Sequence, residues 1–459
     1  MENKMEKRYG LPTAISMVIG VVIGSGVFFK ATSVLKNTGS MGQSLLVIGI
    51  VGLICIICSC VFATMGTKYS KCNGVVDYAE ATLGPRYAYN VGWFMSTMYY
   101  PILCGVLAYI SAMYTCMLVG IPTFSNTHLL IAAVYLLVLC AVNMVSPKLA
   151  GKLQVSMTVI KLIPLLVMAV VGVIIGLSNG NGIKIFSDNS AIEAGMGTGG
   201  IMTAVCAFAF AYEGWIIATT INSELKNPKR DLPLALIVGA LFCTVIYMLY
   251  TYSMSATMGI TEIIEAGDNL PRVAFSNVFG SNLVGTIVMV IIIISCLGTT
   301  NGLILGCMRG MYSLAVRGQG PKPEAVAKID KKTGMPTVSC IIAVGVSIFW
   351  LLQTAILFFN GPLVTGATGN PEWLLAWEGD EIAIITLYAM YIPMFVSWVI
   401  KAKEFGGVRR FVLPILGICA CVFMCYACVL SYGIQAAYYL VFFAIVMIIG
   451  NLFYKKPQA

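Results

Sequence analysis

The sequence predicts an all-α integral membrane protein with twelve transmembrane helices. Of its 459 residues, 59% are apolar and 10% are charged, whereas a soluble domain usually carries about 25% charged residues. The apolar residues form long runs, and a hydrocarbon core about 30 Å thick needs about 20 such residues per helix. A soluble protein of this length would need more polar surface than the chain provides.

Twelve stretches of sequence reach the required length. They are residues 12–36, 42–67, 88–119, 127–146, 152–177, 199–223, 232–258, 282–314, 336–359, 379–401, 410–432 and 434–454. The first follows a basic segment, as in a signal peptide, but it is longer than the apolar part of such a peptide and lacks a small-residue cleavage site. We therefore expect it to remain in the protein as the first span.

The basic residues alternate between the two ends of successive spans. One side holds most of the 28 lysine and arginine residues, and the other holds only Lys30, Lys36, Lys184 and Arg272 beside several acids. Because cytoplasmic loops retain basic residues, both termini are predicted to be cytoplasmic. The net charge of +9 is thus spread over short loops. It does not form a basic face, so no nucleic-acid partner is expected.

The chain has few residues in patterns that would form a catalytic site or a metal site. Almost all of the 16 cysteines lie within apolar runs, where they behave as small hydrophobic residues. No C-x-x-C pair is matched by a second pair, and His128 is the only histidine, so we expect neither a metal site nor a cofactor. An enzyme would need clustered acids, histidines or a nucleophile with a base, and a channel would need a repeated filter or a charged ring.

Two predicted spans contain an interruption. Residues 20–28 of the first span include Gly24, Ser25 and Gly26, which disfavour a helix, and the sixth span places Glu213 beside a glycine. Taken singly, these features fit tight helix packing and a paired acid. The first and sixth spans, however, run in opposite directions. Interrupted helices at matching positions of two inverted repeats point to the binding site of a transporter.

A break in a helix frees backbone groups that lipid cannot satisfy. An amino acid suits both breaks, because its carboxylate can accept hydrogen bonds from N–H groups around Ser25 and Gly26 at a half-helix N-terminus. Its ammonium group can donate to the carbonyl oxygens of residues 210–213.

Four stretches resemble motifs of the amino acid, polyamine and organocation (APC) permeases, and in particular of the L-type amino acid transporter branch and its bacterial relatives. They are residues 20–28, 210–215, 224–233 and 295–302, in order from the first span to the eighth, followed by Arg309 and residues 317–321. The resemblance implies a LeuT-type 5+5 inverted repeat in which helices 1 and 6 are unwound in mid-membrane. Residues 1–403 would form this ten-helix transport core, and residues 404–459 would form two peripheral helices.

The resemblance also implies a function and a site. It implies a secondary active transporter of amino acids in the plasma membrane, working as a sodium-independent exchanger or a proton symporter. The substrate-binding residues would be Val22, Ile23, Gly24, Ser25, Gly26, Phe210, Ala211, Tyr212, Glu213 and Gly214. Among these, Phe210 would also gate the bound substrate, and the meaning of the acid Glu213 stays open. A non-transporting amino acid sensor and a permease for polyamines or cationic amino acids remain alternatives.

Lys161 is the basic residue that lies deepest in a span. It is too far from the cytoplasmic end to reach water easily, so it is either a structural ion-pair partner or a functional charge. In sodium-independent members of the family that the chain resembles, a lysine at the matching position replaces the bound cation. The resemblance therefore implies contacts from Lys161 to first-span carbonyl oxygens and to Ser295 or Thr299.

Animal members of this family attach to a glycoprotein through a cysteine in the loop between the third and fourth spans. The corresponding residues here, 120–127, contain no cysteine. We therefore expect no disulfide-linked heavy chain, and the expected partners are an amino acid and the lipid bilayer.

Overall fold

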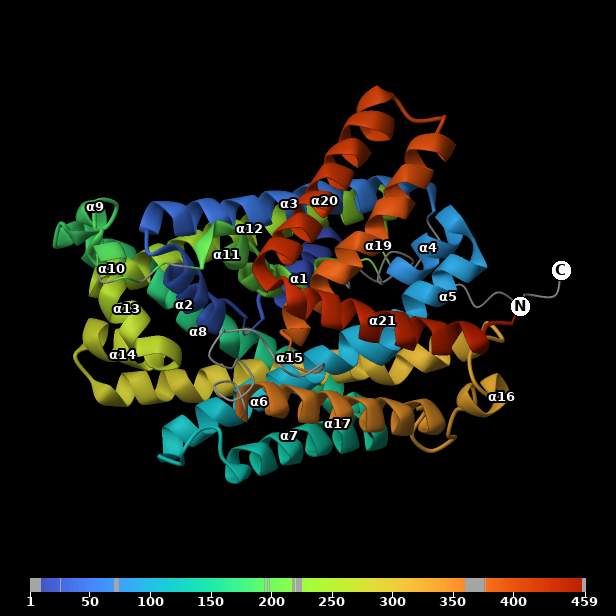
Figure 1. Cartoon of the computed structure of the whole chain (residues 1–459), viewed down its shortest axis with the longest axis horizontal. Coiled ribbons are helices and arrows are strands. Elements are labelled where there is room, and N and C mark those ends of the chain that lie inside the picture. Colours follow the sequence, from blue (N-terminus) through green and yellow to red (C-terminus); the bar gives the residue numbers. More distant parts are fainter. Residues whose placement is uncertain are drawn as a thin grey trace. The chain divides into compact units, whose positions relative to one another are not determined.

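The computed structural model is built from helices throughout its described part, as Figure 1 shows. It describes residues 10–24, 26–69, 74–193, 199–216, 225–359 and 377–455, together with positions 195, 197, 219 and 375. Within these residues, ten helices are long and apolar enough to cross a membrane. An eleventh span results if the bent pair α1 (Leu11–Val22) and α2 (Gly26–Thr38) counts as one.

The predicted count of twelve spans is not reached in the described residues, and the difference lies in the sixth span. There the structure has only a shorter apolar helix, Gly200–Tyr212. Glu213 follows it in an extended conformation with φ −65° and ψ 146°, and Gly214 has φ +108°. The span was predicted from its apolar length, and the backbone leaves the helical region at Glu213, the acid at which the sequence predicted an interruption.

The chain folds into two compact units, each assembled from separate stretches of sequence. The first unit comprises Met1–Ala88, Leu162–Ser281 and Ile384–Ser431, and the second comprises Tyr89–Lys161, Asn282–Ala383 and Tyr432–Ala459. Two long helices, α8 (Pro147–Ser178) and α19 (Gly379–Lys401), contribute residues to both units.

In the first unit, α12 (Pro228–Met258) packs along both α1 and α3 (Met41–Lys68), and α11 (Gly200–Ala209) packs against α2 and α3 (Figure 1). Phe62 on α3 lies at the centre of an aromatic cluster, with ring centroids 4.9–5.7 Å from those of four other rings. Those rings belong to Tyr78, Trp215, Tyr391 and Phe395. Each such edge-on or tilted pair adds about 0.5–1.5 kcal/mol to the burial of its rings.

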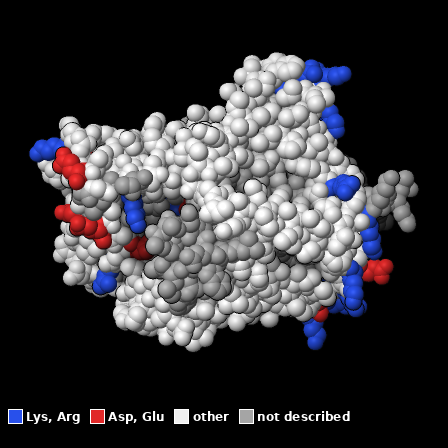
Figure 2. All heavy atoms as spheres, viewed as in Figure 1, with Lys and Arg blue, Asp and Glu red and all other residues white. Residues whose placement is uncertain are grey.

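The remaining elements of the first unit are mostly short. They are α4 (Val75–Leu83), α9 (Asn181–Lys184), α10 (Ser190–Glu193), the 3-10 turns η2 (Phe210–Tyr212) and η4 (Gly267–Asn269), α13 (Ile260–Ala266), α14 (Leu270–Phe279), the π-turn η5 (Val408–Val412) and α20 (Leu413–Tyr432). Figure 2 shows acidic side chains, with a few basic ones among them, near α9, α10 and α13, whereas the surface along the helices shows almost no charge.

In the second unit, α6 (Tyr100–Val119) is the central helix, and α7 (Asn126–Val145), α15 (Asn282–Ala315) and α17 (Thr337–Phe359) pack against it. A buried amide network joins three of its helices. Asn143 donates from Nδ2 to Oδ1 of Asn301 at 2.8 Å. Asn301 in turn donates from Nδ2 to the Ala150 carbonyl and to Oε1 of Gln154, both at 3.1 Å. Among the described residues, Oδ1 of Asn143 has no hydrogen-bond partner. The bonds that are made fix how these buried helices align.

The second unit also holds α5 (Pro85–Phe94), which begins just before it, the π-turn η1 (Met95–Tyr99), α16 (Pro323–Val326) and α21 (Ile434–Leu452). Basic side chains predominate near α16 in Figure 2.

Candidate functional site

The first helix of the chain stops and restarts. α1 ends at Val22, and α2 begins at Gly26 with its axis turned by 52°. Ile23 has φ −70° and ψ 84°, outside the helical region, and the N–H of Gly24 donates to the Val22 carbonyl at 2.7 Å. Ser25, the predicted carboxylate ligand, lies outside the described residues.

The second interruption follows α11. One 3-10 turn, η2, precedes the extended residue Glu213, and the Tyr212 hydroxyl donates to the carbonyl of Ile48 on α3 at 3.1 Å. At Gly214 a Cβ atom would lie 2.8 Å from Cγ1 of Val21. The positive φ of Gly214 and this close approach both favour glycine, so the end of α1 packs directly on the second interruption.

Gly26 brings the two interruptions into backbone contact. A Cβ atom at Gly26 would lie 2.9 Å from Cα of Ala211 and 2.9 Å from Cδ1 of Phe210. The structure therefore collects the described residues of both predicted segments within the first unit. Val22, Ile23, Phe210, Ala211 and Tyr212 are all buried there.

Tyr247 on α12 links the two interruptions, a role that the sequence analysis missed. Its hydroxyl lies 3.0 Å from the Val22 carbonyl and 2.8 Å from the Ala211 carbonyl. The Ala211 carbonyl predicted to bind the substrate amine, and the carbonyl of the candidate substrate-binding residue Val22, are therefore already engaged by this side chain. The sequence signal was a tyrosine inside an apolar span, whose hydroxyl needs a partner when buried.

Changing Tyr247 to phenylalanine is expected to slow amino acid uptake roughly tenfold. The change removes the donor that two buried carbonyl groups share, at a cost of about 1–3 kcal/mol. Tyr250→Phe is the matched control, because the buried Tyr250 hydroxyl has no hydrogen-bond partner in the described part of the chain. Uptake into proteoliposomes measures both variants, and an equal loss in both would contradict the assigned role of Tyr247.

A positive charge lies beside Phe210. The rings of Phe29 and Phe210 have centroids 5.4 Å apart, and Nζ of Lys30 lies 5.6 Å and 5.3 Å from these centroids. Lys30 is only 8% exposed, so this cation–π contact is largely desolvated and correspondingly stronger. Burial raises the pKa of Asp268 in η4, and the nearby charges of Lys36 and Lys30 oppose that rise.

The residues predicted to form the cation-site surrogate lie in the second unit. Lys161 is 2% exposed, and Ser295 is fully buried. Thr299 donates from Oγ1 to the Ser295 carbonyl at 3.1 Å, whereas the Ser295 hydroxyl has no hydrogen-bond partner among the described residues. The structure thus shows no hydrogen bond between Lys161 and the Ser295 hydroxyl, and other interactions hold the lysine.

The helix register nevertheless places Lys161 at the level of Ser295. Gln154 pairs with Asn301, and a Cβ atom at Gly298 would lie 2.7 Å from Cβ of Met157, so α8 and α15 run antiparallel here. Continuing this register along α8 brings Lys161 opposite the turn of α15 that contains Ser295. The contact of Lys161 with first-span carbonyl groups would join the two units and stays a prediction.

Residues 9–452 match the family described as amino acid permease. The chain belongs to this family. The serine/threonine exchanger SteT of Bacillus subtilis is 28% identical over 409 residues, which cover 89% of this chain and 86% of SteT. The b(0,+)-type amino acid transporter 1 of Homo sapiens is 29% identical over 341 residues, covering 73% of this chain and 68% of that protein.

The permease also shares its fold with a solved structure. The crystal structure of MhsT in complex with L-phenylalanine aligns with a TM-score of 0.57 at 16% identity, covering 97% of this chain and 99% of that one. This likeness supports the LeuT-type fold. The permease is thus an amino acid transporter with many membrane-spanning helices.

Proposed function

We propose that the permease is a sodium-independent exchanger of neutral amino acids in the plasma membrane. The observation that carries this proposal is the backbone contact between the two interruptions, at Gly26 and Ala211, with Tyr247 bonded to both. Two helix ends meeting away from lipid offer N–H groups to a carboxylate and carbonyl groups to an ammonium, which are the two charged groups common to all amino acids.

The parts of the substrate are assigned to the two segments as follows. The N–H groups at the start of α2, around Ser25 and Gly26, bind the α-carboxylate. The ammonium group binds the carbonyl oxygens of Phe210 and Glu213, and shares those of Val22 and Ala211 with Tyr247, since each carbonyl oxygen has two lone pairs. Ile23, Gly24, Tyr212 and Gly214 shape the cavity around this backbone.

Lys30 supports a neutral substrate over a cationic one. Its ammonium group lies 5.3 Å from the ring of Phe210, the proposed gate, so a second cation passing that ring would meet a positive charge in a site of low dielectric constant. The nearby carboxyl group of Asp268 offsets part of that charge. The positive charge of Lys30 argues against the permease for polyamines or cationic amino acids. The similarity to a serine/threonine exchanger and to a large neutral amino acids transporter of Homo sapiens, 25% identical over 400 residues, agrees with a neutral substrate.

Lys161 supports independence from sodium, because a buried ammonium beside Ser295 and Thr299 supplies the positive charge that a bound cation would otherwise provide. Proton symport is the second candidate, and Glu213 favours it, since this carboxylate lies at an interruption and interacts electrostatically with Tyr388 and Tyr391. Exchange is preferred because a charge already present at Lys161 needs no proton to complete the site.

The division into units supports the finer architecture that we propose. The first unit takes most of the first, second, sixth and seventh predicted spans, and the second unit takes most of the third, fourth, eighth and ninth. The fifth and tenth are both divided. This correspondence favours a 5+5 inverted repeat in residues 1–403, unwound in mid-membrane in helices 1 and 6, with peripheral helices in 404–459.

We further propose that both termini are cytoplasmic. We also propose that no heavy chain is linked to the permease by a disulfide, since the loop between α6 and α7 contains no cysteine.

A counterflow assay in proteoliposomes tests this function. Vesicles preloaded with serine, alanine, leucine or arginine are given labelled serine outside, without sodium and with or without a pH gradient. We expect labelled serine to accumulate in vesicles preloaded with serine, alanine or leucine, and to accumulate little in vesicles preloaded with arginine. The pH gradient should change neither result. Accumulation that requires the pH gradient would favour proton symport, and binding without any accumulation would favour the sensor.

A further inference from the structure

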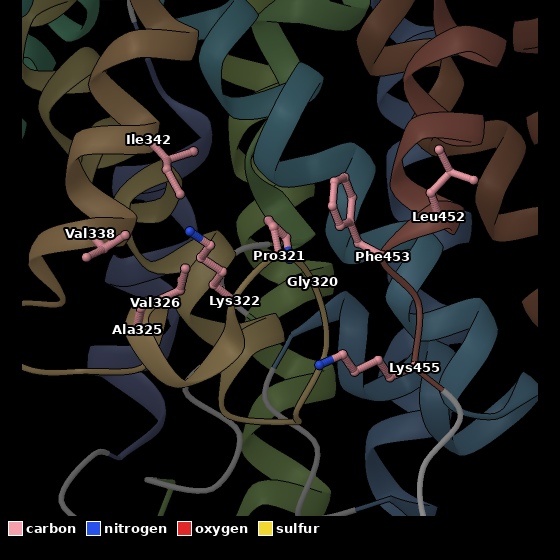
Figure 3. Close-up of a pocket in the computed structure, with 10 residues that line it drawn as sticks. All are labelled: Gly320, Pro321, Lys322, Ala325, Val326, Val338, Ile342, Leu452, Phe453 and Lys455. Carbon is pink, nitrogen blue, oxygen red and sulfur yellow. The ribbon is translucent and has the colours of Figure 1, made fainter.

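We propose that a pocket at the ends of α17 and α21, in the second unit, binds an anionic phospholipid. The pocket has a volume of about 380 Å³, and Figure 3 shows its walls. It is lined by Gly320, Pro321, Lys322, Ala325, Val326, Val338, Ile342, Leu452, Phe453 and Lys455. This site is separate from the residues assigned above to the amino acid and to the cation surrogate.

The position of the pocket matches the boundary between hydrocarbon and headgroups. α17 begins at Thr337 and α21 ends at Leu452, and both helices are long and apolar enough to cross a membrane. The lining side chains of Leu452, Phe453 and Val338 are 77%, 40% and 38% exposed. Apolar side chains exposed at the ends of spanning helices are suited to an acyl chain that continues into the bilayer.

Two lysines belong to the lining of the pocket. Lys322 and Lys455 approach it from opposite walls, as Figure 3 shows, and the described lining contains no acid. Lys322 has φ +45° and ψ 59°, a conformation that residues other than glycine adopt at a cost. The loop holds this lysine in a strained conformation at the pocket, which is expected where a side chain has a binding role.

The walls of the pocket are fixed before any ligand binds. Gln319 donates from Nε2 to the Lys455 carbonyl at 2.5 Å and accepts from the Lys455 N–H at 2.9 Å. The Tyr89 hydroxyl donates to the Gly450 carbonyl at 2.7 Å and so anchors the end of α21. A preformed site loses little conformational entropy when it binds its ligand.

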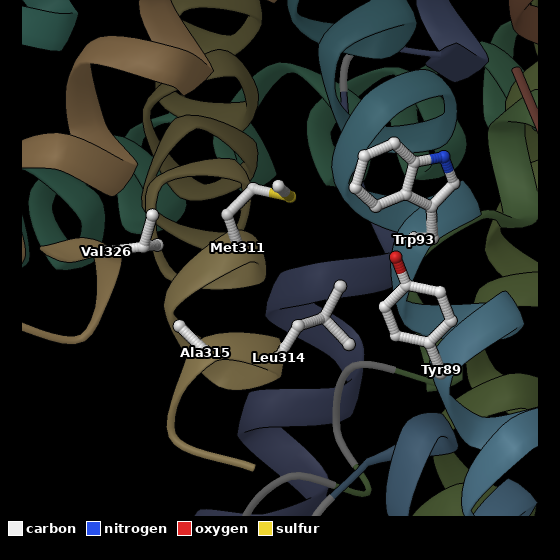
Figure 4. Close-up of a cluster of buried hydrophobic side chains, with 6 residues drawn as sticks. All are labelled: Tyr89, Trp93, Met311, Leu314, Ala315 and Val326. Carbon is white, nitrogen blue, oxygen red and sulfur yellow. The ribbon is translucent and has the colours of Figure 1, made fainter. Parts of the chain in front are cut away.

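A buried cluster supports the pocket from beneath. Tyr89, Trp93, Met311, Leu314, Ala315 and Val326 form this cluster (Figure 4). Val326 also lines the pocket, and Ile342, another lining residue, packs against the cluster. The apolar wall is therefore part of the core of the unit and keeps its shape.

An anionic phospholipid satisfies both parts of the pocket at once. Its phosphate pairs with Lys322 and Lys455, and its acyl chain covers Val338, Ile342 and Leu452. Basic pockets between transmembrane helices on the cytoplasmic side are known to bind such headgroups, and the distribution of basic residues predicts this side for the α15–α17 loop. A free phosphate would leave the apolar wall exposed, and a zwitterionic lipid would bring a second cation toward the two lysines.

Lipid retention by the purified full-length chain tests the proposal. The protein is exchanged into detergent containing phosphatidylglycerol or phosphatidylcholine, and bound lipid is counted by native mass spectrometry while Tm is measured in parallel. We expect preferential retention of phosphatidylglycerol and a higher Tm with it. Glycerol 3-phosphate, which has no acyl chain, should raise Tm little. An equal rise with glycerol 3-phosphate would overturn the lipid assignment.

Matched variants locate the site. Lys322→Gln with Lys455→Gln should weaken phosphatidylglycerol retention roughly fivefold per lysine, since each basic residue near an anionic headgroup contributes about 1 kcal/mol. Lys328→Gln with Lys331→Gln removes the same charge from exposed loop positions outside the pocket, and should retain the lipid. Ala325→Glu, which adds a carboxylate to the lining, should also release it. Equal retention of phosphatidylglycerol by the parent protein and all three variants would overturn the proposal.

Discussion

Replacing Gly26 with alanine is expected to abolish amino acid uptake. No other substitution that adds a single methyl group to this chain is expected to have so large an effect. The added Cβ would lie 2.9 Å from Cα of Ala211 and 3.3 Å from its amide nitrogen. These are backbone atoms of the other interrupted segment, so they can yield only if the segment itself shifts. Overpacking of this kind costs about 1–3 kcal/mol, and here the displaced backbone carries the proposed substrate contacts.

Gly345→Ala is the control for this experiment. Gly345 lies in α17, and a Cβ there would meet no atom within 4 Å. Both variants are purified, their Tm values are compared, and uptake of labelled serine into proteoliposomes is measured. We expect normal uptake from Gly345→Ala and uptake at background from Gly26→Ala. Normal uptake by Gly26→Ala would mean that the contact between the interruptions does not shape the site.

Replacing Lys161 with alanine is expected to abolish transport while the protein still inserts and folds. The side chain is 2% exposed within a membrane span, and its removal would abolish the interaction that it makes there. Leaving a buried polar group without its hydrogen-bond partner typically costs about 1–3 kcal/mol. A loss of this size at the proposed cation position would prevent the site from closing on its substrate.

Lys152→Ala separates this effect from a simple loss of charge. Lys152 lies on the same helix, α8, but is exposed, so its removal should leave uptake within about twofold of the parent, as surface changes usually do. Membrane insertion is checked by size-exclusion chromatography, and transport by counterflow. Full transport by Lys161→Ala would refute both the cation-surrogate role and sodium independence on that basis.

The sequence was sufficient to place both segments of the candidate site. Interrupted stretches around Gly26 and Glu213 were visible because glycine and an acid are unusual in the middle of an apolar run. It was not sufficient to find Tyr247, since a hydroxyl in an apolar span shows that a partner is needed but not which one. The carbonyl of Val22 that it approaches is 225 positions away.

The number of spans shows a related limit. Run length predicted one span over 199–223, and the residue types predicted an interruption within it. The described helix stops at Tyr212, and the backbone is extended at Glu213, so the length criterion alone does not count this segment as a span. Hydropathy reports which residues can lie in lipid and says nothing about the φ and ψ angles that they adopt.

The sequence alone was enough to establish the class and the family of the protein, through the length of its apolar runs and four short motifs in order. The side on which lysine and arginine fall predicts the proposed topology. These properties of the sequence do not depend on which helices pack against one another in the folded protein. The contact of Gly26 with Ala211, the bridge through Tyr247 and the pocket between Lys322 and Lys455 arise from residues far apart in sequence. They exist only after close packing has brought particular atoms within a few ångströms, and no pattern along one chain encodes such distances.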